Sequence, residues 1–259
     1  MGVLNVTPDS FSDGAKWLDP RAAIARGLEM VAEGADVIDV GGESTRPGAV
    51  PVPAQVQIER VVPVIRGLAG SARVSVDTRH PAVAEAAISA GATLVNDVSA
   101  SPEMAKVAAS GGAGWVAMHM QGDPLTMQAA PAYGDVVAEV REFLMSRAAL
   151  GREAGVEEIW VDPGIGFGKT LDHNLALLRA IGELGGPDFP VLIGTSRKAF
   201  LGKLTAGEEI PAPEDRVEAS VATAVWSVIQ GAAMVRVHDV KETVEALRLI
   251  GEPVMAEVA

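Results

Sequence analysis

Short runs of Val, Ile and Leu recur along the chain, and each run stops on or leads to a polar side chain. Near-continuous apolar runs are typical of parallel strands that are buried on both faces of a sheet. One run covers residues 36–42, and the others reach Asn5, Asp77, Asn96 with Asp97, His119, Asp162, Ser196 and His238. The pattern therefore predicts eight buried strands with polar groups at their carboxyl ends.

Alanine-rich stretches with helical spacing lie between these runs. Residues 19–35 place Ala23, Leu28, Met30 and Val31 near one face, and residues 137–155 do the same with Val140, Phe143, Leu144 and Ala148. The helical stretches end at glycine, a frequent residue after a helix terminus. Eight alternations of strand and helix favour a (β/α)₈ TIM barrel of the α/β class, with residues 1–259 as a single domain. A doubly wound open sheet is the alternative.

The polar residues at the strand ends acquire a meaning in such a barrel, because its active-site face lies at the carboxyl ends of the strands. Six polar residues would converge there from five strands, namely Asn5, Asp77, Asn96, Asp162, Arg236 and His238. Any one alone is better explained as a capping or turn residue. Six polar residues at equivalent positions of the strand–helix repeat favour a polar binding site.

Composition narrows the class of ligand. The chain has 34 Asp plus Glu against 21 Lys plus Arg, a net charge of −13, which argues against nucleic acid and anionic membranes as partners. It has no cysteine and no apolar run near the length of about 20 residues that crosses a bilayer, as expected for a cytoplasmic enzyme. The adjacent cations Arg197 and Lys198 still permit an anionic small molecule, since charges act locally within about 8–10 Å.

Three loops after the strands carry candidate chemistry. The sequence NVTPDSFSDG contains a lone Phe11, and GGESTRPGA offers the hydroxyl of Thr45 and the cation of Arg46. Both could equally be flexible surface loops. In DPGIGFGKT, the glycine spacing is not that of a phosphate-binding P-loop, so Asp162 is the stronger feature. Its carboxylate could accept two parallel N–H bonds from a 2-aminopyrimidinone edge, and Asp77 could do the same.

These motifs together resemble dihydropteroate synthase, the folate-pathway family that sulfonamides inhibit. The resemblance rests on NVTPDSFSDGA, DVGGESTRPGA, SVDT, VNDVS, MHMQGDPLTMQ, DPGIGFGKT, GTSRKAFLG and VRVHDVKETVEA, in order from residue 2 to about residue 250. It implies a pterin-binding TIM barrel. Because the sequence begins at the first predicted strand, we expect a barrel without the N-terminal β-hairpin that is usual in the family. Ala15 also replaces a glycine common in the first loop.

The resemblance implies that the protein joins 7,8-dihydropterin-6-ylmethyl diphosphate to p-aminobenzoate. Asp77, Asn96 and Asp162 would hold the pterin edge, and Lys198 its ring acceptors. Thr45 would contact the diphosphate, Arg236 would stack on the pterin and bind diphosphate with His238, and Asn5 would ligate a bridging Mg²⁺. The residues expected to act in catalysis are Asp77, Asp162, Lys198, Arg236 and His238.

The aminobenzoate pocket implied by the family comprises Ser196, Arg46, Pro47, Phe11 and Phe167. Ser196 lies where the seventh loop enters a helix, so its hydroxyl and the N–H groups there are expected to bind a carboxylate. Extended-chain alternation predicts that Ser196 and Lys198 face this site while Arg197 points away and holds the loop.

Other features leave alternatives open. His80, His119 and His173 lack metal-ligand spacing and are interpreted as structural. A corrinoid-type pterin-binding methyltransferase and a catalytically silent pterin-binding regulator are competing functions, and a sulfonamide-insensitive synthase is a variant of the main one. A homodimer is the family expectation, with residues 219–232 around Trp226 as a candidate interface, although this stripe could simply cover the barrel.

Overall fold

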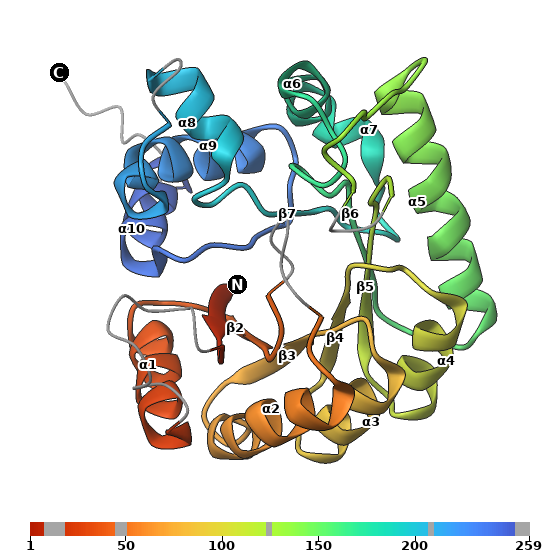
Figure 1. Cartoon of the computed structure of the whole chain (residues 1–259), viewed down its shortest axis with the longest axis vertical. Coiled ribbons are helices and arrows are strands. Elements are labelled where there is room, and N and C mark those ends of the chain that lie inside the picture. Colours follow the sequence, from red (N-terminus) through yellow and green to blue (C-terminus); the bar gives the residue numbers. More distant parts are fainter. Residues whose placement is uncertain (8–18, 45–50, 123–125, 207–209, 252–259) are drawn as a thin grey trace, which may run out of the picture.

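The computed structural model describes residues 1–7, 19–44, 51–122, 126–206 and 210–251. Eight strands alternate with helices, and Figure 1 shows the helices surrounding the strands. The strands are β1 (Gly2–Asn5), β2 (Val37–Gly41), β3 (Arg73–Asp77), β4 (Leu94–Asp97), β5 (Gly114–Met118), β6 (Ile159–Asp162), β7 (Leu192–Ile193) and β8 (Met234–Val235). The helices are α1 (Pro20–Ala32), α2 (Ala54–Leu68), α3 (Pro81–Ser89), α4 (Pro102–Ser110), α5 (Val136–Glu153), α6 (Leu171–Arg179), α7 (Ile181–Leu184), α8 (Ala199–Ala206), the 3₁₀ turn η2 (Pro213–Arg216), α9 (Val217–Ile229) and α10 (Val240–Gly251).

The sequence sets where several helices begin. Asp19 accepts a hydrogen bond from the N–H of Arg21 at 3.0 Å before Pro20 opens α1. Ser101 likewise accepts from the N–H of Met104 at 3.1 Å before α4. A small oxygen-bearing residue at the cap and proline at the first helical position are favourable because they satisfy or remove unpaired N–H groups. Within the described ranges, no helix is both long and apolar enough to cross a membrane.

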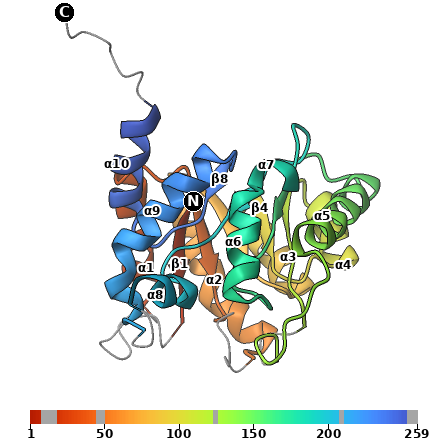
Figure 2. The same ribbon diagram turned by 90° about the horizontal axis from the view of Figure 1, so that it is seen from above.

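The strands form a closed parallel barrel, as predicted. Strands β1 to β6 pair consecutively, and β7 pairs with β8 in a second, two-stranded sheet. Single parallel bridges, Gly2 with Val237 and Val161 with Val191, join the two sheets at both seams. The N-terminus lies beside β8 (Figure 2), where the amine of Met1 donates to the carbonyl of Val235 at 2.9 Å.

The main core lies between the strands and the helices and includes Val140, Leu144 and Ala148 of α5, as predicted. The expectation for α1 was partly wrong, because Leu28 is 40% exposed. Its buried face is Ala23, Gly27 and Met30, which follows the spacing of one helical face. A Cβ at Gly27 would lie 2.8 Å from a methyl of Leu68, so glycine permits close packing of α1 on α2.

Candidate functional site

Alternation along the strands gives the barrel interior two layers. The lower layer is an apolar cluster of Met1, Val37, Leu94, Val116 and Leu192, with Trp160 and Met234 packed against it. Side chains two residues apart face the same side of a strand, so the residues two positions after this apolar cluster also point into the barrel. They include Asp39, Asn96, Asp162 and Arg236. The apolar layer therefore supports a polar layer at the carboxyl ends of the strands.

A network of carboxylates around Arg236 links four strands. Arg236 donates from Nε to Oδ2 of Asp39 at 2.6 Å and from Nη2 to Oδ2 of Asp77 at 2.8 Å. Asn96 donates from Nδ2 to the same Asp39 oxygen at 2.9 Å. Burial raises the pKa of Asp77 to about 7, although Arg236 acts to lower it. Burial acts to lower the pKa of Arg236, but Asp39 and Asp77 outweigh it and raise that pKa above its ordinary value.

Asp162 and Lys198 are two oppositely charged groups of the polar layer that influence each other's pKa. Asp162 accepts a 2.7 Å bond from the N–H of Gly164, and Lys198 donates to the carbonyl of Ile165. Burial raises the pKa of Asp162 above its ordinary value, against the lowering effect of Lys198. Burial also lowers the pKa of Lys198 to about 8, while Asp162 acts to raise it. The Lys198 ammonium lies 4.7 Å from the centre of the Phe167 ring.

Four side chains hold the glycine-rich loop after β6: two come from the segment between β5 and α5, one from the segment after β7, and one from the loop itself. Its carbonyls at 165, 166, 167 and 168 accept bonds from Lys198, Gln128, Lys169 and Tyr133 respectively. Gly164 has a φ of 64°, and a Cβ there would lie 1.9 Å from the carbonyl oxygen of His119. The loop is thus fixed against the end of β5 independently of any ligand.

The buried pair Lys169 and His119 supports this loop. The Lys169 ammonium lies 2.9 Å from Nδ1 of His119 and donates to the Phe167 carbonyl at 2.9 Å. Burial lowers the pKa of Lys169 to about 7, and burial together with Lys169 lowers the pKa of His119 to about 3. His119 also packs edge-on against Phe143 of α5. This is a structural role, as predicted for His119.

The other two histidines that were interpreted as structural lie at helix starts. His173 closes the capping box of α6 with Thr170, and His80 is the N-cap residue of α3. Neither is part of the Arg236 network.

The cations after β7 separate as predicted, but for a different reason. Arg197 has a φ of 60°, so the chain turns here instead of continuing as an extended strand. Its guanidinium pairs with Asp239, and Lys198 points to the loop after β6. Ser196 is buried, and its hydroxyl lies 3.0 Å from Nδ1 of His238 and accepts from the N–H of His238 at 3.1 Å. Ser196, Lys198 and His238 are thereby brought to the same end of the barrel as Arg236.

Asn5 is half-buried at the end of β1, where it pairs in register with Gly41. Its amide oxygen lies 3.2 Å from the place that a Cβ on Gly41 would take, so glycine leaves room for it. Within the described residues, no group of three or more His, Asp or Glu could hold a metal ion. One amide oxygen fits a Mg²⁺ that draws its other ligands from phosphate and water, and not a cage built by the protein.

Four predicted site residues, Phe11, Thr45, Arg46 and Pro47, lie outside the described residues. The segments that flank the last three are held together, because Glu43 accepts a 2.7 Å bond from the N–H of Val52.

Asp39 is the site residue that the sequence reasoning missed. The predicted site residues lie at strand ends, whereas Asp39 lies in the middle of β2. An acidic residue within an otherwise apolar run was a usable signal, since a charge is rarely fully buried without a partner.

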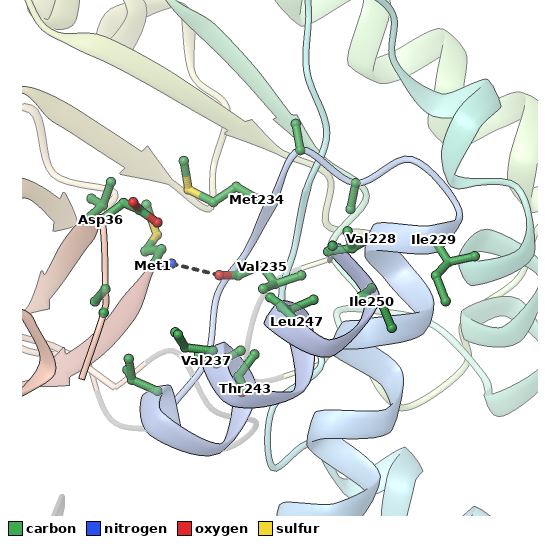
Figure 3. A pocket seen from close by; sticks show the side chains of 18 of the residues that line it. Met1, Asp36, Val228, Ile229, Met234, Val235, Val237, Thr243, Leu247 and Ile250 are labelled. Atoms are coloured by element: carbon green, nitrogen blue, oxygen red, sulfur yellow. Dashed lines mark hydrogen bonds between the residues drawn. The ribbon is translucent and has the colours of Figure 1, made fainter. Parts of the chain in front are cut away.

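The polar layer can bind a flat ring that presents N–H donors along one edge, because Asp77, Asn96 and Asp162 all carry buried acceptor oxygens. Lys198 and Arg236 add donors for ring acceptors or for an anion. A separate cavity of about 670 Å³ lies at the opposite end of the barrel, lined mainly by apolar side chains such as Val235 and Leu247 (Figure 3). It contains none of the predicted site residues.

Known proteins resemble this chain in both sequence and structure. A family model described as "Pterin binding enzyme" matches residues 1–238. The dihydropteroate synthase of Mycobacterium leprae is 47% identical over 97% of this chain and 92% of its own length. The Yersinia pestis dihydropteroate synthase, solved in complex with a sulfonamide drug, has a TM-score of 0.90 and 43% identity over 96% of this chain and 92% of that one. The Burkholderia cenocepacia dihydropteroate synthase, solved with 7,8-dihydropteroate, has a TM-score of 0.86 and 46% identity over 96% of this chain and 89% of that one.

Proposed function

Because the chain belongs to the dihydropteroate synthases within the pterin-binding enzyme family, we propose that it joins 7,8-dihydropterin-6-ylmethyl diphosphate to p-aminobenzoate. The products are 7,8-dihydropteroate, the compound bound by the Burkholderia relative, and diphosphate. The enzyme is therefore a transferase whose leaving group is diphosphate.

The pterin ring binds in the polar layer. Asp77 and Asp162 accept N–H bonds from the ring edge, Asn96 adds an amide, and Lys198 donates to ring acceptors. One observation carries this assignment: these four groups, two of them acidic, are gathered on an apolar floor at the carboxyl ends of the strands. Buried acceptors that lack protein donors are costly, so they favour a ligand that supplies donors. Oδ1 of Asp77 is such an atom among the described residues.

The aminobenzoate carboxylate binds at Ser196, beside the start of α8. Phe167, fixed by the bond from Lys169 to its carbonyl, forms one wall of the pocket. Phe11, Arg46 and Pro47 complete it on the family pattern. This orientation leaves the amine of p-aminobenzoate directed toward the exocyclic carbon of the pterin.

The reaction is a dissociative substitution. The bond from the exocyclic carbon to diphosphate oxygen breaks, and the dihydropterin ring delocalises the resulting positive charge. The arylamine then forms the new C–N bond and loses its proton to solvent, so no strong base is required. Asp77 and Asp162 favour the developing cation, and Arg236, His238 and Thr45 bind the departing diphosphate.

Magnesium is the cofactor that we propose for this site, with Asn5 as its protein ligand. When bound, Mg²⁺ would offset negative charge on the leaving group. The half-buried amide oxygen of Asn5 at the end of β1 supports this choice, as does the small number of protein ligands that Mg²⁺ commonly uses.

The test is diphosphate release measured with each substrate alone, with both together, and with and without Mg²⁺. The proposal expects release only when both substrates and Mg²⁺ are present. Pterin binding without diphosphate release would instead point to a methyltransferase or a silent regulator. Release without p-aminobenzoate would mean that the protein is a hydrolase.

Three further properties extend this proposal. Sulfonamides resemble p-aminobenzoate and should compete with it, as the drug complex of the Yersinia relative suggests. Trp226, Ile229 and Leu249 of α9 and α10 are exposed apolar residues, which supports a homodimer through these helices. Sedimentation equilibrium tests the dimer. Folate synthesis also implies a cytoplasmic enzyme, which cell fractionation tests.

A further inference from the structure

Asp39 connects three parts of the barrel that are not adjacent in the sheet. One oxygen of this fully buried carboxylate, Oδ2, accepts from Arg236 on the segment after β8 and from Asn96 on β4. Strand β1 separates β2 from β8, and β3 separates β2 from β4. The two hydrogen bonds therefore cross the barrel interior and link side chains that belong to different strands.

The arrangement constrains what Arg236 presents to a ligand. Its Nε is bound to Asp39 and its Nη2 to Asp77, so the plane of the guanidinium is fixed by two carboxylates. Without Asp39, Arg236 would be free to pair with Asp77 through both edges, since a guanidinium and a carboxylate favour a bidentate pair. That pairing would occupy the carboxylate that the ring edge needs.

Asp39 also limits how the amide of Asn96 turns. The Nδ2 group donates to Asp39 at 2.9 Å, so its carbonyl oxygen lies on the other side of the amide. An amide that is not held by a partner can present either of its two ends, and each choice changes the donor and acceptor pattern offered to the ring.

We propose that Asp39 is a positioning residue for ring binding, which fixes the guanidinium of Arg236 and the amide of Asn96 so that Asp77 stays available to the pterin. The inference rests on the proposed function. It assigns to Asp39 no contact with the reacting atoms and none with diphosphate, which Asp39 affects only through Arg236.

The test uses Asp39→Asn, which keeps the shape of the side chain and removes its charge. Calorimetry measures binding of 6-hydroxymethylpterin, which carries the ring alone, and of inorganic diphosphate. We expect the ring dissociation constant to rise about 30-fold, the order of a hydrogen bond to a charged group. The diphosphate constant should change less than about threefold, because the cation of Arg236 remains in place and His238 and Thr45 also bind diphosphate. A ring constant within about threefold of wild type, or equal weakening of both ligands, would overturn the proposal.

A matched control separates positioning from loss of stability. Asp97 is another buried carboxylate, but its oxygens accept from Ser99, Ser101 and Trp115, outside the Arg236 network. Asp97→Asn should therefore destabilise the fold and leave the ring constant unchanged. In the background of Arg236→Met, Asp39→Asn should cause a smaller loss of ring affinity than it does alone, because only its hold on the amide of Asn96 remains to be lost. Fully additive losses would show that Asp39 does not act through Arg236.

A measurement on the unaltered protein covers the case in which Asp39→Asn does not fold. The Nε–H of Arg236 should give a slowly exchanging NMR signal before and after 6-hydroxymethylpterin is added. Loss of that signal on addition of the ring would mean that the link to Asp39 breaks in the complex, which contradicts the proposal. If the wild type neither binds the ring nor releases diphosphate, the proposed function fails. If it does both and Asp39→Asn matches it, only this inference fails.

Discussion

Replacing Lys198 by alanine should weaken pterin binding selectively. Lys198→Ala removes the ammonium that donates to the Ile165 carbonyl and lies beside Asp162 and over the Phe167 ring. A hydrogen bond to a charged group contributes about 1.5–3 kcal/mol, which corresponds to roughly a 10- to 100-fold rise in the pterin KM. The lost cation–π contact contributes about 0.5–1 kcal/mol, so the aminobenzoate KM should rise less than about fivefold through Phe167.

The assay is steady-state diphosphate release with each substrate varied in turn. Lys203→Ala is the matched control, because Lys203 lies on the same helix, α8, and is exposed. It should leave both KM values unchanged. A pterin KM within about threefold of wild type in Lys198→Ala would remove Lys198 from the ring site. Equal rises in both KM values would mean that Lys198 acts only by holding the loop after β6.

Three other outcomes follow from the geometry. Burial lowers the pKa of Lys198 to about 8, so the ammonium loses its proton as pH rises through that value. The kcat/KM for the pterin should fall over the same pH range, and the pH profile of Lys198→Ala should lack this fall. Asp97→Asn should lower the free energy of unfolding by about 2 kcal/mol in urea titrations, because one of its acceptor oxygens becomes a donor; an altered pterin KM would contradict its purely structural role. Gly164→Ala should lose both stability and activity, since its Cβ would meet the His119 carbonyl. Gly112 is the control, because it has a similar φ of 65° and open space around it. Gly112→Ala should show only the conformational cost of about 1–2 kcal/mol in the same titrations.

The fold could be predicted from the sequence because strand burial leaves a clear pattern. Each apolar run became a strand of the barrel, and Asp77, Asn96 and Asp162 reached the same end of it. The prediction placed Leu28 on the buried face of α1 because leucine is apolar. The helical spacing instead puts Gly27 on that face, where it contacts the neighbouring helix.

The pattern of apolar and polar residues could not predict the detailed contacts of the site, because these depend on tertiary contacts and on local backbone conformation. Asp39 was missed because its partners, Asn96 and Arg236, are 57 and 197 residues away in sequence, and only barrel closure brings them together. Arg197 and Lys198 separate through a left-handed turn, which no pattern of apolar and polar residues specifies. The roles of the predicted side chains toward substrates stay predictions, as do those of Phe11, Thr45, Arg46 and Pro47.

The acidic and basic side chains of the polar layer lie on different sheets of the barrel. Asp39, Asp77 and Asp162 belong to the six-stranded sheet, while the cations Lys198 and Arg236 follow the strands of the two-stranded sheet. Among the described residues one isolated bridge joins the sheets at each seam, and the ion pairs of Arg236 add a further link between the two sheets. A pterin held by both groups, as we propose, would span the same junction. Ring binding should therefore stabilise the junction, and amide hydrogens along the seams, such as those of Val3 and Val237, should exchange more slowly once the ring is bound.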